Sequence, residues 1–426
     1  MQEKQDIQIH TLDNGIIVIT ERMEHIYSLS IGLWLKEGSR DEDKKLLGIS
    51  HFTEHMFFKG TINKTALEIA KIIDSLGGNI DAFTSKENMC FYGSFLEEHF
   101  PIAAELFSDL ISNPRFDPLE TEKERNVIIE EIKSIDDSPS DLLFDQFTRF
   151  FWAHHPLGEP ISGDIKTMAR ITNNDVRNFF LQKFYPHNML ITVAGSLDHE
   201  EIYKLSNHYF GSFKAVPQPK EPRIAPVNHS FIKHINKSQL EQVHVCLGTA
   251  GYPANDEKRY AYYLLNTILG GSMSSRLFQK IREEEGIVYS VLSLINSYLD
   301  TGFTVVYLAT SKENTKKALK LSSEEIIKLK NEPVDAMELE RAKQHIKGNL
   351  LLGLEISSNR MVNLAKQHIY FDKFISTEET IESIESVTVE DIQEVANDLF
   401  QTRYLALAII GKVNNVKIDI NEINWD

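Results

Sequence analysis

The chain repeats itself on either side of a proline-rich stretch, and this duplication limits the folds it can adopt. Residues 171–185 precede an apolar run that ends at Gly195. Residues 387–401 precede a matching run that ends at Gly411, at one constant offset of 216 and without a gap. In each copy a Thr followed three residues later by Asp forms a capping-box pattern, which predicts a helix and then a β-branched strand. Four prolines within residues 214–226 exclude a helix interior and predict an extended linker.

The predicted domain organisation follows from this repeat. We expect an N-terminal domain over residues 1–213, a linker over residues 214–228 and a homologous C-terminal domain over residues 229–426. A strand is predicted early in each half, at residues 28–35 and 243–248, and neither half shows a strict alternation of strands and helices. The predicted fold class is therefore α+β. It consists of two homologous α/β-sandwich-like domains whose mostly antiparallel sheets carry helices on one face.

Composition excludes several classes of function. A formal net charge of −17 argues against nucleic-acid binding, which needs a basic face. We favour an ordinary acidic surface, although an acidic cavity that attracts basic peptides would give the same charge. No run of 18 or more apolar residues suggests a membrane span, and the polar N-terminus lacks the pattern of a signal peptide. Cys90 and Cys246 lie in apolar runs and are expected to be buried free thiols, which favours a cytoplasmic location.

Residues 48–58 carry the strongest functional signal in the chain. The run has no Pro and no Gly after Gly48, so a helix is predicted. His51, Glu54 and His55 follow the order H-x-x-E-H, which places two imidazoles one turn apart on one face. Two neutral imidazoles at this spacing can hold Zn²⁺, and the neighbouring carboxylate can take a proton from a water that the metal polarises. The pattern is the inverzincin signature; the alternative is a surface helix with two solvated histidines.

A catalytic zinc site needs a third protein ligand. Residues 118–133 are predicted to form a helix that starts at a Pro. Glu124 and Glu131 lie seven residues apart on one face of this helix, whereas Glu130 points elsewhere. Spacing alone does not choose among the glutamates of this helix. The second half has no comparable motif, so one zinc ion per chain is predicted.

Several short segments match one known family. They are LDNG (12–15), EGSR (37–40), HFTEHMFFKGT (51–61), GGNIDAFTS (77–85), HPLG (155–158), LGGSMSSRL (269–277) and IREEEGIVY (281–289). In these segments the sequence resembles the pitrilysin and mitochondrial-processing-peptidase family of zinc metallopeptidases over nearly its whole length. In that family the third zinc ligand is a Glu about 76 residues after the second His, a distance at which Glu131 stands. Glu124 matches a family carboxylate that supports the site by orienting a ligating His.

The resemblance also assigns roles in the second half. Family members use an Arg and a Tyr seven residues apart to hold substrate and to steady the tetrahedral intermediate, and Arg282 and Tyr289 match them. A guanidinium and a phenol can both stabilise the negative charge that develops on an attacked carbonyl. The alternatives are a surface ion pair for Arg282 and core packing for Tyr289.

The resemblance further implies a peptide-binding edge strand. In the family an extended substrate adds to this strand through main-chain hydrogen bonds. The matching residues are Asp81, Ala82, Phe83, Thr84 and Tyr92. Asp81 departs from the family pattern, which commonly has Asn, and a carboxylate there cannot donate to a substrate carbonyl unless it is protonated.

The predicted function is that of a zinc endopeptidase or oligopeptidase acting on peptide substrates, with Glu54 as general base. The two-domain branch of the family implies a homodimer that encloses a chamber, with Arg282 and Tyr289 serving the zinc of the partner subunit. The alternative is a catalytically silent scaffold, or a processing subunit that depends on a partner chain. Such subunits typically lack part of the zinc motif or the Arg/Tyr pair, and this chain has both.

Overall fold

The computed structural model describes residues 5–214, 222–414, 418–419 and 423–426. Residues 215–221 of the predicted linker lie outside the described residues. The chain divides into two compact units. Unit 1 comprises Met1–Ser134, Glu159–Arg223 and Leu351–Phe374, and unit 2 comprises Ile135–Gly158, Ile224–Leu350 and Ile375–Asp426. Among the described residues, no helix is both long and apolar enough to cross a membrane.

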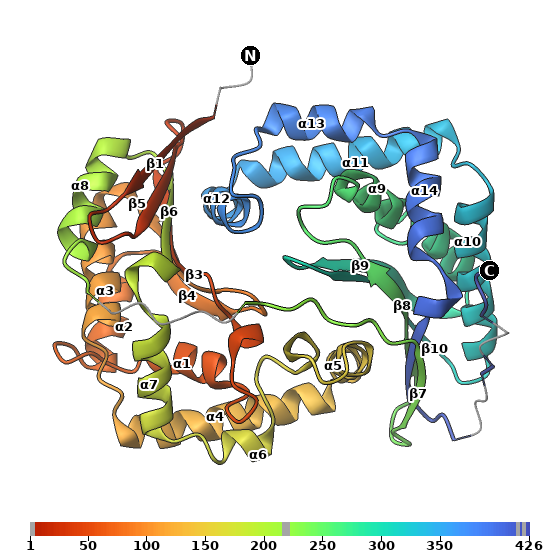
Figure 1. Cartoon of the computed structure of the whole chain (residues 1–426), viewed down its shortest axis with the longest axis horizontal. Coiled ribbons are helices and arrows are strands. Elements are labelled where there is room, and N and C mark those ends of the chain that lie inside the picture. Colours follow the sequence, from red (N-terminus) through yellow and green to blue (C-terminus); the bar gives the residue numbers. More distant parts are fainter. Residues whose placement is uncertain (1–4, 215–221, 415–417, 420–422) are drawn as a thin grey trace. The chain divides into compact units, whose positions relative to one another are not determined.

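Unit 1 is built on a sheet with the strand order β1-β2-β6-β3-β5-β4 (Figure 1). Its strands are β1 (Asp6–Thr11), β2 (Ile17–Arg22), β3 (Ser28–Leu35), β4 (Asn79–Thr84), β5 (Met89–Leu96) and β6 (Met189–Gly195). β2 and β6 pair in parallel, and the other neighbours pair antiparallel. Among the described strands β4 pairs with β5 alone, so it is an edge strand of this sheet and the side away from β5 is called its open edge.

Helices cover both faces of this sheet. The helices of unit 1 are α1 (Ile49–Phe57), α2 (Ala66–Ser75), α3 (Phe100–Ser112), most of α4 (Pro118–Asp137), α6 (Ile165–Met168), α7 (Asn173–Lys183), α8 (His199–Phe210) and α12 (Ser357–Phe371). Alternate residues of the central strands point to opposite faces. Leu33 and Phe91 pack with α3, α7 and α8, whereas Trp34 and Cys90 pack against α12 on the other face.

Unit 2 has a sheet with the strand order β7-β11-β8-β10-β9. Its strands are β7 (Phe231–Asn236), β8 (Val243–Gly251), β9 (Val288–Ser297), β10 (Gly302–Thr310) and β11 (Ala406–Gly411). Its helices are α5 (Pro139–Phe151), α9 (Arg259–Leu269), the π-helical segment η5 (Phe278–Glu284), α10 (Thr315–Asn331), most of α11 (Ala336–Leu354), α13 (Thr377–Ser386) and α14 (Val389–Leu399). Leu247 and Leu407 pack with α9, α10 and α14. Cys246 and Ala408 face the opposite way and pack against α5.

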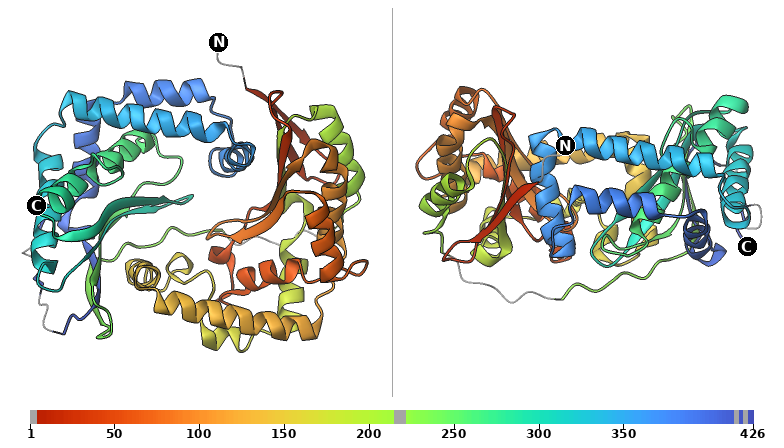
Figure 2. Two further views of the ribbon diagram at one scale, coloured as in Figure 1. Left: turned by 180° about the vertical axis from the view of Figure 1, so that it is seen from behind. Right: turned by 90° about the horizontal axis from the view of Figure 1, so that it is seen from above.

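Each unit contains one helix from the other half of the sequence. α5 comes from the first half and covers a face of the sheet of unit 2, where Phe147 packs in the core. α12 comes from the second half and covers a face of the sheet of unit 1 (Figure 2). Its Met361 side chain is fully buried. The long helices α4 and α11 each pass from one unit into the other. The compact units therefore differ from the contiguous domains expected from the sequence, although the chain changes unit between Arg223 and Ile224, inside the predicted linker.

The predicted α+β class with mostly antiparallel sheets is confirmed. The two sheets share one order, because β2-β6-β3-β5-β4 corresponds to β7-β11-β8-β10-β9, as duplication requires. The structure adds that a helix also covers the second face of each sheet. Cys90 and Cys246 are both buried and unpaired, as expected.

Candidate metal centre and peptide-binding edge

The helix α1 carries the H-x-x-E-H motif and follows its N-cap residue Gly48, whose φ of +91° favours glycine. A Cβ atom at Gly48 would lie 2.6 Å from the backbone oxygen of Ser162, so the close approach also requires glycine. The carboxylate of Glu42 accepts hydrogen bonds from the backbone N–H groups of Gly48 and Ser50, both at 2.8 Å. These bonds satisfy N–H groups that the start of a helix leaves without helical partners. Glu42 therefore caps the helix that carries the motif.

The helix α4 packs against α1 through a shared apolar core. Phe52 and Met56 of α1 are buried together with Ile128 and Ile132 of α4. This packing turns the face of α4 that carries Glu131 toward the two histidines of α1. Sequence spacing predicted that Glu130 points elsewhere, and in the structure its carboxylate pairs with Lys133 at the surface.

His51, His55 and Glu131 come together into one cluster. The Nε2 atom of His51 lies 3.6 Å from Oε1 of Glu131, and the Nε2 atom of His55 lies 3.5 Å from Oε2. One ligand atom from each residue lies within 4.8 Å of the others. Ligands about 2.0–2.2 Å from a tetrahedral Zn²⁺ are about 3.3–3.6 Å apart, so the two His–Glu131 separations suit this ion.

A further set of contacts orients the imidazole of His55. Its Nδ1 atom lies 3.1 Å from Oε2 of Glu124. A carboxylate only accepts, so Nδ1 carries a hydrogen, and Nε2, on the side of Glu131, is the nitrogen that could ligate a metal after it gives up its own proton. The other oxygen of Glu124 lies 2.7 Å from Nζ of Lys59. Glu124 thus links the imidazole of His55 to a cation.

Burial and charge act differently on the three members of the cluster. Burial lowers the pKa of His51 to about 4, so this imidazole is neutral and able to ligate near pH 7. Burial also disfavours the charged form of His55, but hydrogen bonds with Glu131 and Glu124 outweigh it and raise the pKa. The hydrogen bond with His55 lowers the pKa of Glu131 and keeps it a carboxylate. Two imidazoles and one anionic oxygen are the donor set of a catalytic zinc site.

Glu54 lies on α1 beside this cluster and faces the strand β4. Its Oε2 atom accepts a hydrogen bond of 2.5 Å from the hydroxyl of Thr84. Burial raises the pKa of Glu54, and the bond from Thr84 opposes this shift. A carboxylate with a raised pKa beside a metal cluster suits a group that accepts and later returns a proton.

The predicted peptide-binding residues lie together on β4 and its neighbour β5. Asp81 pairs with Tyr92 across the two strands, and the Tyr92 hydroxyl lies 3.5 Å from the Asp81 carboxylate. Ser85 donates its N–H to Asn88 across the turn. Residues that bond to the neighbouring strand alternate along an antiparallel pair. Because Ser85 bonds toward β5, Phe83 and Asp81 do so as well. The N–H groups of Ala82 and Thr84 therefore face the open edge.

Two of these side chains already have partners within the unit. The Oδ1 atom of Asp81 accepts the N–H of Ala82 at 2.8 Å. The ring of Phe83 packs edge-on against Trp34, with 5.6 Å between the ring centroids. Phe83 therefore belongs partly to the core beneath α12, and the open edge consists of main chain more than of side chains.

Arg282 and Tyr289 belong to unit 2, whereas the metal cluster belongs to unit 1. The Arg282 guanidinium lies over the ring of Phe278 at 4.7 Å and over the ring of Tyr289 at 5.9 Å. Tyr289 is 77% exposed, which argues against the core-packing alternative. An ion pair of Arg282 with Glu283 is long, at 3.9 Å. Arg282 lies in the π-helical segment η5, a conformation that often accompanies functional sites.

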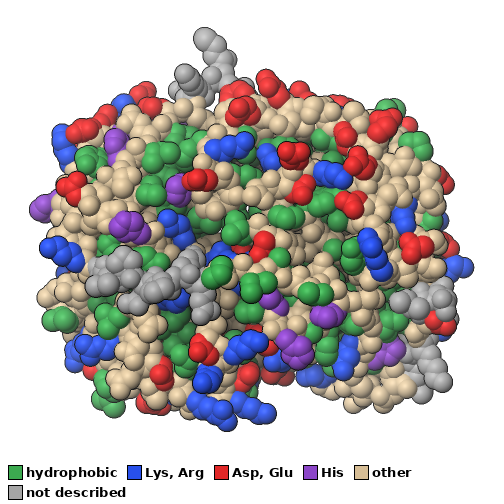
Figure 3. Space-filling model, in the orientation of Figure 1, with side chains coloured by type: hydrophobic (Ala, Val, Ile, Leu, Met, Phe, Trp, Pro, Cys, Tyr) green, Lys and Arg blue, Asp and Glu red, His purple; other side chains and the backbone are tan. Residues whose placement is uncertain are grey.

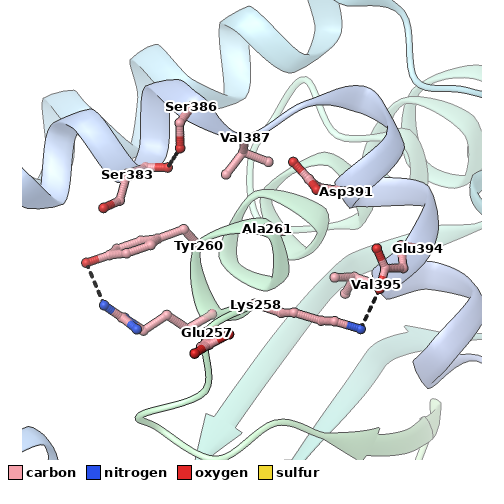
Figure 4. A pocket seen from close by; sticks show the side chains of 11 residues that line it. Glu257, Lys258, Tyr260, Ala261, Ser383, Ser386, Val387, Asp391, Glu394 and Val395 are labelled. Atoms are coloured by element: carbon pink, nitrogen blue, oxygen red, sulfur yellow. Dashed lines mark hydrogen bonds and ion pairs between the residues drawn. The ribbon is translucent and has the colours of Figure 1, made fainter.

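A separate pocket of about 400 Å³ lies in unit 2 between the start of α9 and the helices α13 and α14 (Figure 4). Its polar groups pair with each other: Lys258 lies 2.8 Å from Glu394, and Arg259 donates to the Tyr260 hydroxyl.

Among the described residues, the cluster of His51, His55 and Glu131 is the one group of His, Cys, Asp or Glu side chains suited to a metal. On the face drawn in Figure 3, acidic side chains are spread among Lys and Arg.

Sequence patterns did not reveal Lys59 or Glu42 as parts of the site. Lys59 lies two residues beyond the end of α1, so the helical period that links His51 and His55 does not extend to it. Glu42 bonds to N–H groups six and eight residues ahead across an irregular loop, which no periodic pattern describes.

Comparisons with known proteins identify the family to which the chain belongs. Residues 17–165 match the family model described as Insulinase (Peptidase family M16). Residues 170–346 match the model described as Peptidase M16 inactive domain. The first match contains the metal cluster, and the second contains the Arg/Tyr pair.

Curated relatives and solved structures extend the similarity to nearly the whole chain. An uncharacterized zinc protease of Bacillus subtilis is 36% identical over 410 residues, which covers 96% of this chain and 99% of the relative. An uncharacterized zinc protease of Mycobacterium tuberculosis is 36% identical over 404 residues, covering 94% and 92%. The crystal structure of a protease from Helicobacter pylori superposes with a TM-score of 0.90 at 22% identity, covering 96% and 100%. That structure supports the fold alone.

Proposed function

Because this chain belongs to peptidase family M16 and is a zinc metallopeptidase, we propose that it cleaves extended peptides as an endopeptidase or oligopeptidase. The observation that carries the proposal is the cluster of His51, His55 and Glu131 with Glu54 beside it. The open edge of β4 lies next to Glu54 through Thr84. A metal-ligand set, a base and a peptide-docking edge thus occur in one unit.

The three cluster residues would hold one Zn²⁺ ion per chain. When bound, the ion would supply a Lewis acid that polarises the scissile carbonyl and acidifies water. Glu54 would take a proton from the attacking water and pass it to the leaving amine. Glu124 would keep the imidazole of His55 oriented, because its carboxylate accepts the Nδ1 hydrogen.

The peptide would bind as an added strand along β4. The outward N–H groups of Ala82 and Thr84 offer donors that do not depend on the side chains of the peptide. This mode is tolerant of sequence and suits a peptidase with a broad range of extended substrates. Tyr92 and Asp81 would line the edge beside the docked peptide.

Arg282 and Tyr289 would stabilise the negative charge of the transition state. We place them in a homodimer that encloses a chamber, where they serve the zinc of the partner subunit. The support is the distribution of the functional residues, because the zinc motif and the Arg/Tyr pair belong to opposite halves of the sequence. The cytoplasm is the proposed compartment.

The first experiment is cleavage of a quenched peptide library, with the zinc content measured on the same samples. Wild type is expected to cleave, and Glu54→Gln is expected to retain zinc while losing at least about a hundredfold in kcat. Glu130→Gln on α4 is the control, because its carboxylate meets only a surface Lys. A wild-type protein that binds zinc and cleaves no peptide in the library would favour the silent-scaffold alternative.

The second experiment tests the shared site. Glu54→Gln chains mixed with Arg282→Ala chains are expected to regain about a quarter of wild-type activity, because half of randomly paired dimers are mixed and each holds one intact site. Each variant alone is expected to be inactive. Absence of recovery in mixtures that native mass spectrometry shows to contain mixed dimers would count against sharing.

A further inference from the structure

Thr84 lies where the peptide-binding edge meets the helix that carries the metal motif. It is the last residue of β4, and its Oγ1 atom lies 2.5 Å from Oε2 of Glu54 on α1. Its backbone N–H faces the open edge, as the alternation from Ser85 requires. The main chain and the side chain of one residue thus point to two different parts of the site.

The direction of this hydrogen bond determines what it can do. An ionised carboxylate only accepts, so the Thr84 hydroxyl donates. The bond holds Oε2 of Glu54, and the structure records no donor for Oε1 among the described residues. Oε1 is therefore the oxygen that remains available to receive a proton.

A Glu side chain has several rotatable bonds and samples many rotamers when it is not held. Catalysis by a general base requires the accepting oxygen to lie within hydrogen-bond reach of the proton that it takes. A single hydroxyl that selects one carboxylate orientation can therefore change the rate of the chemical step without contacting the peptide.

We propose that Thr84 is a positioning residue for Glu54, whose hydroxyl aims the carboxylate while its main chain belongs to the peptide-binding edge. The inference deepens the proposed function and rests on it. It also separates Thr84 from its neighbours on β4, because its hydroxyl serves the base and is not available to bind the peptide.

The test compares three variants on one quenched peptide. Thr84→Val keeps the β-branched shape and removes the hydroxyl, whereas Thr84→Ser keeps the hydroxyl. Thr11→Val is the matched control, because Thr11 is the exposed last residue of β1 at the opposite edge of the same sheet. We expect kcat of Thr84→Val to fall about 10- to 100-fold, with KM within about twofold of wild type. Thr84→Ser is expected to stay within about threefold in kcat, and Thr11→Val is expected to match wild type.

A second measurement separates positioning from a general structural role. Thermal unfolding of wild type, Thr84→Val, Glu54→Gln and the double variant gives a double-mutant cycle that needs no activity. If the hydroxyl acts through Glu54, the two substitutions are expected to change the free energy of unfolding non-additively, with zinc content unchanged in every variant. In the Glu54→Gln background, Thr84→Val is also expected to leave the Kd for an uncleaved peptide unchanged.

Three results would overturn the inference: full kcat in Thr84→Val, a loss of kcat that Thr84→Ser shares, or a loss explained by missing zinc. Failure of the proposed function gives a different result. In that case wild type itself cleaves no peptide, whereas the inference alone fails when wild type cleaves and Thr84→Val cleaves equally well.

Discussion

The Nδ1 atom of His55 lies 3.1 Å from one oxygen of Glu124, and the ammonium group of Lys59 lies 2.7 Å from the other. Lys59 and His55 thus hold a single carboxylate from both sides. This carboxylate holds a hydrogen on Nδ1, and it leaves Nε2 as the nitrogen that could ligate a metal.

The first prediction concerns this carboxylate. Glu124→Gln is expected to weaken zinc binding about 10- to 100-fold, because a neutral amide orients and polarises the imidazole less strongly. Competition with a chromophoric chelator measures the Kd for zinc. The same substitution at Glu130 removes a surface carboxylate from the same helix and is expected to leave the Kd unchanged. Equal Kd values for Glu124→Gln and wild type would refute the role given to Glu124.

The second prediction concerns removal of the metal. Zinc that binds the folded state alone stabilises it by about 4 kcal/mol at a free concentration a thousand times the Kd. A chelator is therefore expected to lower the melting temperature of wild type, and added zinc is expected to restore it. Glu131→Gln lacks the anionic ligand and is expected to melt at nearly the same temperature with and without chelator. A large chelator effect on this variant would place the metal elsewhere.

The sequence predicted some of these contacts and missed others for identifiable reasons. The helical period alone brought His51, Glu54 and His55 together, because all three lie within one turn. The choice of Glu131 among the glutamates of α4 needed the family resemblance, since spacing shows only which glutamates share a face. The bond from Thr84 to Glu54 joins a strand to a helix thirty residues away, and no local pattern encodes such a contact.

The exchange of α5 and α12 was also missed. An amphipathic helix shows in its sequence that one face will be buried, but it does not show which sheet buries it. Each of the two helices follows a long helix that passes from one unit into the other. The repeat in the sequence led us to expect contiguous domains, whereas each compact unit contains a helix from the other half of the chain. The strand order of each sheet and the antiparallel pairing did follow the predicted duplication.

The third prediction is a pH dependence set by Glu42, which caps α1. Burial raises its pKa from 4.5 to about 7. Below pH 4.5 the carboxyl group is neutral in the folded and the unfolded chain, and its contribution to stability is fully present. Between pH 4.5 and pH 7 the unfolded chain releases this proton, whereas burial keeps it bound in the folded chain. Above pH 7 the folded chain must hold a buried charge, so the contribution of Glu42 to the free energy of unfolding is lost.

Glu42→Gln does not titrate and isolates this effect. The free energy of unfolding of wild type, minus that of Glu42→Gln, is expected to fall by about 3 kcal/mol between pH 4 and pH 8. Urea unfolding with chelator present in both samples measures the difference without a contribution from zinc. A difference that stays constant or rises over this range would contradict the raised pKa.

The fourth prediction concerns the buried ion pair that holds the β4–β5 turn. Arg40 donates to Glu87 at 2.6 Å, and both side chains are almost completely buried. Arg40→Met is expected to reduce the free energy of unfolding by about 1–3 kcal/mol, because it removes a hydrogen-bonded cation from a buried carboxylate while the Arg223 guanidinium stays 3.7 Å from the same oxygen. Lys133→Met breaks the exposed pair with Glu130 and is expected to cost less than about 1 kcal/mol. Denaturant unfolding of both variants measures the difference, and equal losses would show that the Arg40 pair behaves like a surface pair.

The fifth prediction concerns Asp81 at the open edge of β4. Its carboxylate accepts the N–H of Ala82 at 2.8 Å, the same N–H that the strand alternation turns toward an incoming peptide. In the proposed mode of binding, a peptide carbonyl would have to displace this carboxylate before it could bind to the N–H of Ala82. Asp81→Ala removes the competing acceptor and is expected to lower KM about two- to tenfold, the range of one hydrogen bond of about 0.5–1.5 kcal/mol, with little change in kcat. Asp13→Ala is the control, because it removes the same charge from the exposed turn between β1 and β2. It is expected to leave KM unchanged. A lower KM in both variants would mean that net charge, and not the edge of β4, controls peptide binding.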